Sequence, residues 1–383
     1  MSIQLTDEQH MIQIMARDFA RKELIPTAAE RDETKEFPLE NLKIMGELGL
    51  LGMTVPVEYN GAGVDTVSYS LALQEIAYGC ASTAVIMSVH NSVCGEPITR
   101  FGSEYLKDKY LKQLAIGEML GSFALTEPGA GSDPSSQRTT AVRDGDFYIL
   151  NGVKQFITTG LNSGVTVVTA LTDKARKHRG ISAFVVEKGT PGFYVGKVED
   201  KMGLRASDTV QLIFEDCRVP AKNLLGREGD GFKIAMSALD GGRIGIASQS
   251  VGVAQACLDA AIEYAKQRVQ FGQPIANYQG IRWMIADMAT EIEAARLLTL
   301  NAAAMKDRGE RFSAQASMAK LYASEMVNRI AYKAIQIHGG YGYLKDFPVE
   351  RFYRDARVFT IYEGTSEIQR IVISNHFLGP LFK

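Results

Sequence analysis

Residues 165–171 read VTVVTAL and residues 181–186 read ISAFVV, with sequence of helical period on both sides of them. Short apolar runs that are rich in β-branched residues and bounded by Gly and Asp turns are typical of strands. Two similar runs occur at 147–150 (FYIL) and 210–214 (VQLIF). These runs predict a small β-domain in the middle of the chain.

The flanking segments predict helices on both sides of this β-domain. Residues 5–9 (LTDEQ) fit a capping box with Thr6 as N-cap and Gln9 at position N3, so a helix should begin there. Apolar residues recur at helical spacing in further segments. These segments are 39–50, 68–78, 104–116, 244–268, 278–306, 313–338 and 367–377.

The order helical, β, helical predicts an α+β fold with three domains. We expect an N-terminal α-helical domain (1–120), a central β-domain that is a small barrel or stacked sheets (121–230), and a C-terminal four-helix bundle domain (231–383). A doubly wound nicotinamide-binding fold is disfavoured, because no strand leads through a GxGxxG loop into a helix.

Composition excludes several classes of protein. The 383 residues are 46% hydrophobic and 22% charged, which is ordinary globular usage. With 42 Lys plus Arg against 44 Asp plus Glu, the net charge of -2 offers no polycationic surface, so we expect no nucleic acid partner.

Neither a membrane span nor a secretory signal is expected. Residues 76–95 lack charge, but polar residues such as Ser82, His90 and Asn91 interrupt them, which favours a buried helix and loop over a membrane span. Residues 1–10 contain Asp7 and Glu8 and lack a basic segment followed by an apolar core, so we expect a cytoplasmic protein.

The cysteines and histidines predict neither a metal site nor a disulfide framework. Cys80, Cys94, Cys217 and Cys257 form no CxxC pair and have no histidine at metal-ligand spacing, so reduced thiols are expected. We expect His338, on an apolar helix, to be a packed or backbone-contacting group.

The segment 123–133 (FALTEPGAGSD) follows an apolar run and combines two glycines with several hydrogen-bonding side chains. Glycine has no Cβ, so such a loop can bring its N–H groups close to a flat or anionic ligand. A strand-to-strand turn that uses Gly for positive φ is the structural alternative.

The segment 361–365 (IYEGT) precedes Ser366-Glu367-Ile368-Gln369, which fits a second capping box. The N–H groups at this helix start favour an anionic or oxygen-rich ligand. Glu363 becomes a competent base if an apolar pocket raises its pKa, whereas a solvated surface carboxylate is the alternative.

Two further segments place polar groups at helix ends. Arg268, Phe271 and Gln279 surround the break at 271–274 (FGQP), and residues 336–340 (QIHGG) end another helix. A cation and amides at helix termini can hold a pyrophosphate or heterocycle, but capping and interhelical packing explain them equally well.

Taken together and in this order, these segments resemble the acyl-CoA dehydrogenase family of flavoproteins over essentially the whole chain, and most closely its short-chain, or butyryl-CoA, branch. The segments that carry the resemblance are 123–133, 156–158, 199–203 (EDKMG), 240–243 (DGGR), Arg268 with Phe271-Gly272, 336–340 and 361–370.

The resemblance implies noncovalently bound FAD and a homotetramer built as a dimer of dimers. It places one set of residues near the flavin of the same subunit, namely Phe123, Leu125, Thr126, Gly131, Ser132, Phe156, Ile157, Thr158, Thr365 and Glu367. A second set approaches the FAD of the partner subunit, namely Arg268, Phe271, Gln279, Gln336, Gly339 and Gly340. Many relatives have Trp where this chain has Phe156.

The resemblance also implies the reaction, which is dehydrogenation of a short-chain acyl-CoA to a trans-2-enoyl-CoA. Glu363 matches the catalytic base. Ser132, Asp240, Arg243 and Gly364 match positions that contact the CoA thioester, and an electron-transferring flavoprotein is the implied electron acceptor, with oxygen as the alternative.

Substrate choice is less constrained by the sequence. Ala84 stands where glutaryl-specific relatives have an arginine, which disfavours a dicarboxylyl substrate. His90, Asn91, Cys94 and Glu96 either polarise the acyl pocket, which suits a branched or alicyclic (cyclohexanecarbonyl-type) acyl group, or cap a helix end. A non-catalytic helical subunit of an electron-transfer complex is the alternative from another class.

Overall fold

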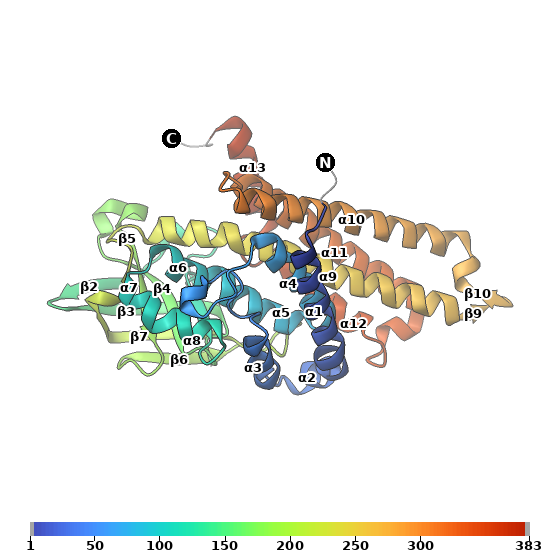
Figure 1. The fold of residues 1–383 in the computed structure, drawn as a ribbon, viewed down its shortest axis with the longest axis horizontal. Helices are drawn as coiled ribbons and strands as arrows, with labels where there is room; N and C mark the ends of the chain where they lie inside the picture. Colours follow the sequence, from blue (N-terminus) through green and yellow to red (C-terminus); the bar gives the residue numbers. More distant parts are fainter. Residues whose placement is uncertain (1–3, 380–383) are drawn as a thin grey trace.

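The computed structural model describes residues 4–379, in which helices, then strands, then helices follow one another (Figure 1). The sheet lies at one end of the long axis, and the long helix α9 (Gly231–Gln267) runs from the sheet toward the other end. This architecture confirms the α+β prediction.

The N-terminal part is helical, as predicted. Thr6 and Gln9 form the capping box, with Gln9 N–H donating to Thr6 Oγ1 at 3.2 Å. The elements are α1 (Asp7–Phe19), η1 (Ala20–Leu24), η2 (Ile25–Thr27), α2 (Ala28–Thr34), α3 (Leu39–Glu47), η3 (Val57–Tyr59), α4 (Thr66–Gly79), α5 (Ala81–Ser88), η4 (Val89–Gly95), α6 (Glu96–Phe101), α7 (Glu104–Leu106), η5 (Lys107–Leu111) and α8 (Lys112–Ala115).

Residues 76–95, expected as a buried helix and loop, are helical except at Cys80, which separates α4 from α5. The buried α5 continues into η4, a π-helix, and then into α6. Polar side chains inside it bond back to the chain, as Ser92 does to the Ser88 carbonyl at 2.6 Å, so the helix accommodates them without ending.

The strands of the central part form one eight-stranded sheet in the order β6-β7-β3-β2-β4-β5-β8, with β1 parallel to β4. The pair Thr140–Leu171 alone joins β2 to β4. The elements are β1 (Gly121–Ala124), η6 (Pro134–Ser136), β2 (Thr140–Asp144), β3 (Phe147–Thr158), β4 (Val165–Leu171), η7 (Lys174–Gly180), β5 (Ile181–Glu187), β6 (Phe193–Val198), β7 (Thr209–Pro220), η8 (Ala221–Asn223) and β8 (Leu224–Leu225).

Strand β4 is buried on both faces, which explains its nearly continuous apolar sequence. Val167 packs with Leu114 and other residues of the N-terminal helices. Val168 packs on the other face with Leu212 of β7. The two halves of the sheet thus share one core, while β6 and β8 end the strand order without pairing to each other, so the described strands form stacked halves rather than a closed barrel.

The C-terminal part is a helical bundle in which α9, α10 and α11 pack together and α13 packs on α11. Helix α9 begins at Gly231, well before the expected Ile244, and α12 was not expected. The elements after α9 are β9 (Val269–Gln270), β10 (Gln273–Pro274), η9 (Ile275–Asn277), α10 (Gln279–Asp307), α11 (Ser313–His338), η10 (Gly339–Tyr343), α12 (Val349–Ala356), η11 (Arg357–Thr360) and α13 (Ser366–Leu378).

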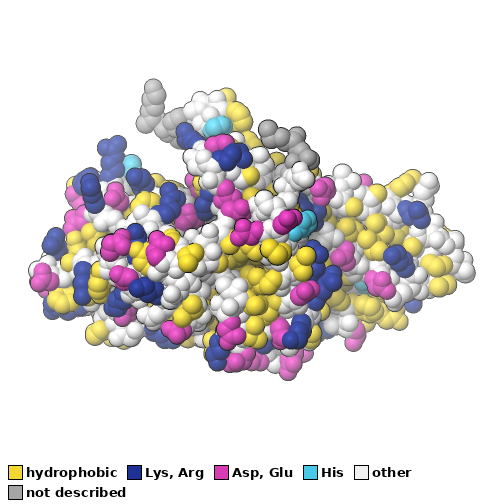
Figure 2. Space-filling model, viewed as in Figure 1, with side chains coloured by type: hydrophobic (Ala, Val, Ile, Leu, Met, Phe, Trp, Pro, Cys, Tyr) yellow, Lys and Arg dark blue, Asp and Glu magenta, His cyan; other side chains and the backbone are white. Residues whose placement is uncertain are grey.

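Several further expectations concern single residue types. His338 contacts the Ala334 carbonyl at 2.8 Å and stacks on Tyr264, as predicted. All four cysteines are free thiols. Within residues 4–379, no helix is long and apolar enough to cross a membrane, and no three His, Cys, Asp or Glu side chains gather as metal ligands. Figure 2 shows basic and acidic side chains interspersed over one face of the molecule.

Candidate active site

Glu363 lies in the turn between η11 and α13, where two consecutive residues have positive φ. The φ angles are 50° at Glu363 and 93° at Gly364. Glycine adopts this conformation freely, whereas Glu363 incurs a cost of roughly 1 kcal/mol. Such strain is characteristic of functional sites, where the surrounding structure holds a side chain in place.

The Glu363 carboxylate is buried, and neither of its oxygens has a hydrogen-bond partner within the described chain. It lies against α9 at Gly242, where even a Cβ atom would overlap it. Burial raises the pKa of Glu363 to about 7, although the positive charges of Lys320 and Arg243 oppose this shift. A carboxyl group with this pKa can exchange a proton near neutral pH.

Arg243 and Asp240, one turn apart on α9, lie beside this carboxylate. Arg243 Nη1 donates to Asp240 Oδ1 at 2.5 Å, and the Ser313 hydroxyl bonds the other oxygen of Asp240. Burial lowers the pKa of Arg243, and its Nε has no partner within residues 4–379. Of the four residues expected near the thioester, Gly364, Arg243 and its partner Asp240 thus belong to the surroundings of Glu363, whereas Ser132 lies in the exposed turn after β1.

The start of α13 differs from the prediction by one residue. The N-cap is Thr365, whose Oγ1 accepts from Ile368 N–H at 3.3 Å, rather than Ser366. The Gln369 side chain does not close a capping box. Its Nε2 donates instead to the carbonyls of Glu363 at 3.2 Å and Gly364 at 2.9 Å, so it fixes the turn that carries the carboxylate.

The loop after β1 is anchored by a buried ion pair between Lys154 of β3 and Glu127. Lys154 Nζ donates to Glu127 Oε1 at 2.9 Å, to the Leu125 carbonyl at 3.0 Å and to Gln137 Oε1 at 3.0 Å. Burial lowers the pKa of Lys154 to about 8. Burial also opposes ionisation of Glu127, but Lys154 and the N–H of Arg138 lower the pKa of that carboxyl. The ionised pair therefore binds Leu125 at the start of the loop and Gln137 and Arg138 at its end.

Most residues expected near the flavin lie on β1, on β3 or in this loop, whereas Thr365 and Glu367 lie at the start of α13. Phe123 of β1 is half-buried and Leu125 is buried, whereas Gly131 and Ser132 lie in the exposed turn. On β3, Phe156 has φ 61° and is 63% exposed, which is unusual for an aromatic side chain. The Ile157 side chain is buried in the sheet core.

The residues expected to approach a partner's cofactor gather at the other end of the bundle. The Arg268 guanidinium lies 5.3 Å from the Tyr341 ring, which links the end of α9 to the end of α11. Figure 1 shows the β9–β10 hairpin at the opposite end of the long axis from β2 and β3. The members of this set are Arg268, Phe271, Gln279, Gln336, Gly339 and Gly340, and apart from the half-buried Arg268 all are exposed.

A cavity of about 720 Å³ opens at the start of α13, between α11 and the segment from α12 to η11. Thr365 and Glu367, both expected near the flavin, line it together with Tyr332, Arg329 and Arg357. Cations beside a helix N-terminus suit an anionic or oxygen-rich group.

Three family models match successive parts of the chain. They are the N-terminal domain of acyl-CoA dehydrogenase at residues 6–118, its middle domain at 122–217 and its C-terminal domain at 229–378. The chain belongs to the acyl-CoA dehydrogenase family.

Among curated proteins, the chain is 53% identical to the mitochondrial short-chain specific acyl-CoA dehydrogenase of Rattus norvegicus, over 98% of this chain and 92% of that protein. It is also 50% identical to the acryloyl-CoA reductase (NADH) of Anaerotignum propionicum, over 99% and 96%.

Solved structures of the family agree closely. Butyryl-CoA dehydrogenase from Megasphaera elsdenii superposes with a TM-score of 0.97 at 46% identity, over 99% of this chain and 100% of that one. A chain in the structure described as the electron transferring flavoprotein of Acidaminococcus fermentans gives a TM-score of 0.98 at 50% identity, over 99% and 100%.

In this member of the acyl-CoA dehydrogenase family, the polar residues of 90–96 have structural partners. The Gly121 N–H donates to His90 Nδ1 at 3.1 Å, and His90 Nε2 lies 3.0 Å from the Leu114 carbonyl. Asn91 bonds the backbone of Met53 and Leu50. Cys94 is buried beside Gly121, and Glu96 pairs with Lys306 at 2.7 Å. These contacts favour the structural interpretation of the four residues over the pocket-polarising one.

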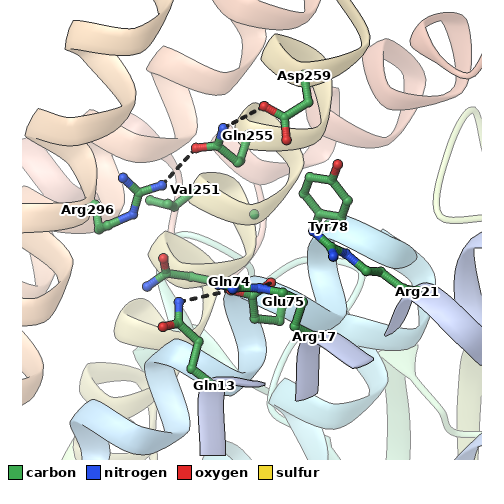
Figure 3. Close-up of a pocket in the computed structure, with 11 residues that line it drawn as sticks. Gln13, Arg17, Arg21, Gln74, Glu75, Tyr78, Val251, Gln255, Asp259 and Arg296 are labelled. Carbon is green, nitrogen blue, oxygen red and sulfur yellow. Dashed lines mark hydrogen bonds and ion pairs between the residues drawn. The ribbon is translucent and has the colours of Figure 1, made fainter. Parts of the chain in front are cut away.

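A second cavity, of about 320 Å³, lies between α1, α4, α9 and α10 (Figure 3). The predicted site residues do not line it. Most of its charged groups have partners within the cavity: Arg17 donates to Glu75 at 2.8 Å, and Gln255 links Arg296 to Asp259 through hydrogen bonds. This cavity therefore holds a network with internal partners, separate from the site around Glu363.

Sequence reasoning missed Lys154, Lys320 and Gln369, which hold the two loops of the site. Both lysine side chains are fully buried. A signal for Lys320 was present, because it lies on the stripe of small residues of α11, three or four positions from Ala316, Ser317, Ala323 and Ser324. A lysine on a buried stripe indicates a partner supplied by another element.

Proposed function

We propose that this protein catalyses the FAD-dependent α,β-dehydrogenation of a short-chain acyl-CoA to the trans-2-enoyl-CoA, with Glu363 as the base. One observation carries the proposal: the Glu363 carboxylate is buried without a hydrogen-bond partner, and its pKa is raised to about 7. A surface carboxylate, the alternative considered for this position, would have neither property.

The chain supplies the groups that proton removal from Cα of an acyl thioester requires. The Glu363 carboxylate takes the proton, while a donor must bond the thioester oxygen, on which negative charge develops. Within residues 4–379 the Glu363 N–H has no acceptor, so it is free for this oxygen. The strained turn thus presents the base and a donor from one residue.

The residues at the two ends of the molecule fit FAD. Phe156 offers an exposed aromatic face beside the open glycine turn, where a Cβ on Gly131 would meet nothing within 4 Å. Gly339 and Gly340 are equally open. Phe123, Leu125, Thr126, Ser132, the 156–158 backbone, Thr365 and Glu367 would hold the cofactor within the subunit. When bound, FAD supplies the acceptor for the hydride that leaves Cβ.

Assembly is part of this proposal. The residues at the β9–β10 end lie away from the sheet of their own subunit, so they serve a cofactor only when a second copy brings them to it. Phe271 is 94% exposed, Tyr343 86% and Trp283 62%, and burying such aromatics stabilises an interface. We therefore propose a homotetramer of two dimers, with Arg268, Phe271, Gln279, Gln336, Gly339 and Gly340 reaching the partner's FAD.

We further propose that the domain boundaries lie at residues 120 and 230 and that the protein is cytoplasmic. An electron-transferring flavoprotein is the proposed acceptor, which is supported by the match to a chain in the Acidaminococcus structure.

The surface of α9 next to Glu363 suits a short acyl group. Gly245 lies one turn after Gly242, and Ser88 and Tyr69 crowd it so closely that a Cβ would collide with the Ser88 hydroxyl. Buried hydroxyls at this distance along the helix limit the room for a long hydrocarbon chain. Ala84, fully buried, offers no cation for a distal carboxylate.

The test is anaerobic titration of the purified flavoprotein with butyryl-, isobutyryl-, glutaryl- and cyclohexanecarbonyl-CoA, for wild type and Glu363→Gln. Butyryl-CoA should bleach the wild-type flavin, and Glu363→Gln should bind FAD and ligand but bleach at least about 100-fold more slowly. Full bleaching by the variant would remove Glu363 from its role. Preference for the cyclohexanecarbonyl thioester would assign an alicyclic substrate, and a colourless protein that takes up no FAD would favour a non-catalytic subunit.

A further inference from the structure

The turn that carries Glu363 is held by a lysine from a different element. Lys320 of α11 is fully buried, and its Nζ donates to the Gly364 carbonyl at 2.7 Å. Gln369 donates to the same carbonyl and to that of Glu363. Three donated bonds therefore fix two successive peptide groups, at the point where the backbone adopts its strained conformation.

The ammonium group bonds the backbone and leaves the carboxylate without a direct partner. Both Glu363 oxygens lack hydrogen bonds within the described residues, so the carboxylate stays available for a substrate proton. A direct Lys–Glu ion pair would hold the carboxylate as an acceptor and weaken it as a base. Binding the neighbouring carbonyl instead keeps the positive charge close while sparing the reactive oxygens.

Charged and titratable groups lie near Lys320 and Glu363 on the elements packed around them. The positive charges of Lys320 and Arg243 both lower the pKa of Glu363, against the larger effect of burial. Burial lowers the pKa of Lys320 itself, while the negative charge of Glu363 opposes that shift. The groups concerned are Arg243 on α9, Tyr69 on α4, Glu325 on α11, Glu367 on α13 and Tyr362 beside Glu363.

We propose that Lys320 is a positioning residue for Glu363: its ammonium group holds the 363–364 turn through the Gly364 carbonyl, and its charge sets the pH at which the Glu363 carboxylate ionises. This inference rests on the proposed function, since it assigns a task to Lys320 only if Glu363 is the base.

The test uses the flavin-loaded enzyme with Lys320→Met, which removes charge and donor, and Lys320→Gln, which keeps a donor but removes the charge. The acid limb of the single-turnover bleaching rate should move to higher pH by about one unit in both variants, because an opposite charge near a carboxyl lowers its pKa. At pH values above the acid limb, the bleaching rate should be lower in Lys320→Met than in Lys320→Gln, because only glutamine can still donate to the Gly364 carbonyl. The control is Lys43→Met, which removes an exposed lysine of α3 that pairs with Glu40. It should change neither the position of the acid limb nor the bleaching rate.

A second readout does not depend on turnover. The carboxyl stretch of Glu363, identified in infrared difference spectra by its loss in Glu363→Gln, should titrate at higher pH in both Lys320 variants. An unchanged acid limb together with an unchanged infrared titration in a folded Lys320 variant would overturn the inference. The proposed function would still stand in that case, provided that Glu363→Gln fails to bleach the flavin. If neither neutral variant folds, Lys320→Arg provides the test: it keeps a charge and a donor, so it should keep the wild-type acid limb, and a folded Lys320→Arg with a limb moved to higher pH by about one unit or more would overturn the inference. Full bleaching by Glu363→Gln would instead overturn the function itself.

Discussion

The carboxylate of Glu363 rests directly on the backbone of α9 at Gly242, with no room for a side chain between them. The contact joins residues from distant parts of the chain and sets how closely the base approaches the helix. Helix α9 therefore accepts a residue of low helix propensity in its interior, since any larger residue would displace the carboxylate.

Gly242→Ala tests this contact. Alanine favours the helix by about 1 kcal/mol, so the variant should fold, but its methyl group should push the carboxylate away and slow flavin bleaching by about 100-fold or more. Circular dichroism and stopped-flow absorbance measure the two effects. A folded variant that bleaches at the wild-type rate would show that the carboxylate does not need this position.

The raised pKa of Glu363 predicts a pH-dependent stability difference. Its folded pKa of about 7 exceeds the unfolded value near 4.5, so the uncharged form favours folding and that contribution is lost as pH rises from about 4.5 through 7. Glutamine does not ionise. Glu363→Gln should therefore gain stability over wild type at pH 8, by up to about 3 kcal/mol, and lose this advantage at pH 4.5. Urea unfolding at both pH values measures the gain, and an equal gap at both would contradict the shift.

The Lys154–Glu127 pair should control the loop that carries the predicted flavin contacts. Lys154→Met leaves a buried carboxylate unpaired, which should destabilise the protein by about 3 kcal/mol or more and weaken FAD binding. The double variant Lys154→Met, Glu127→Gln removes that charge and should recover part of the stability. Urea unfolding and FAD titration of the apoprotein give the two readouts. A double variant less stable than the single one would reject the pairing argument.

Phe271 should be needed for assembly. Phe271→Asp places a charge on the exposed tip of the β9–β10 hairpin, where the proposal puts a subunit interface, so it should shift the protein to smaller species that lose FAD. Sedimentation velocity and flavin content report both. Tyr194→Asp, at an aromatic of β6 that is 53% exposed, serves as the matched control and should change neither. Unaltered sedimentation of Phe271→Asp would place the interface elsewhere.

Features set by neighbouring residues could be predicted from the sequence. The Thr6–Gln9 capping box and the buried run 165–171 depend on local chemistry and on burial, and both appear as expected. The second cap was misplaced because Thr365 and Ser366 are both good N-cap residues. The choice between them depends on Gln369, whose amide bonds the preceding turn instead of closing a box.

Features set by distant partners could not be predicted. The start of α9 was placed too late because Gly241 and Gly242 weaken the helical pattern. The groups that crowd them, Glu96 and Lys306 at Gly241 and Glu363 at Gly242, lie far away along the chain. Lys320 was missed for the same cause, since its acceptor belongs to another element. The roles of the predicted site residues came from a resemblance to a family, because no local sequence pattern specifies them.

The burial of β4 has a consequence for handling the protein. The η7 segment between β4 and β5 is exposed and carries Lys174, Arg176, Lys177 and Arg179, so trypsin should cut there first. Seven residue pairs still join β4 to β5, and both strands are buried. The two fragments should therefore remain associated after cleavage and separate only in denaturant, which offers a way to label one half of the sheet independently of the other.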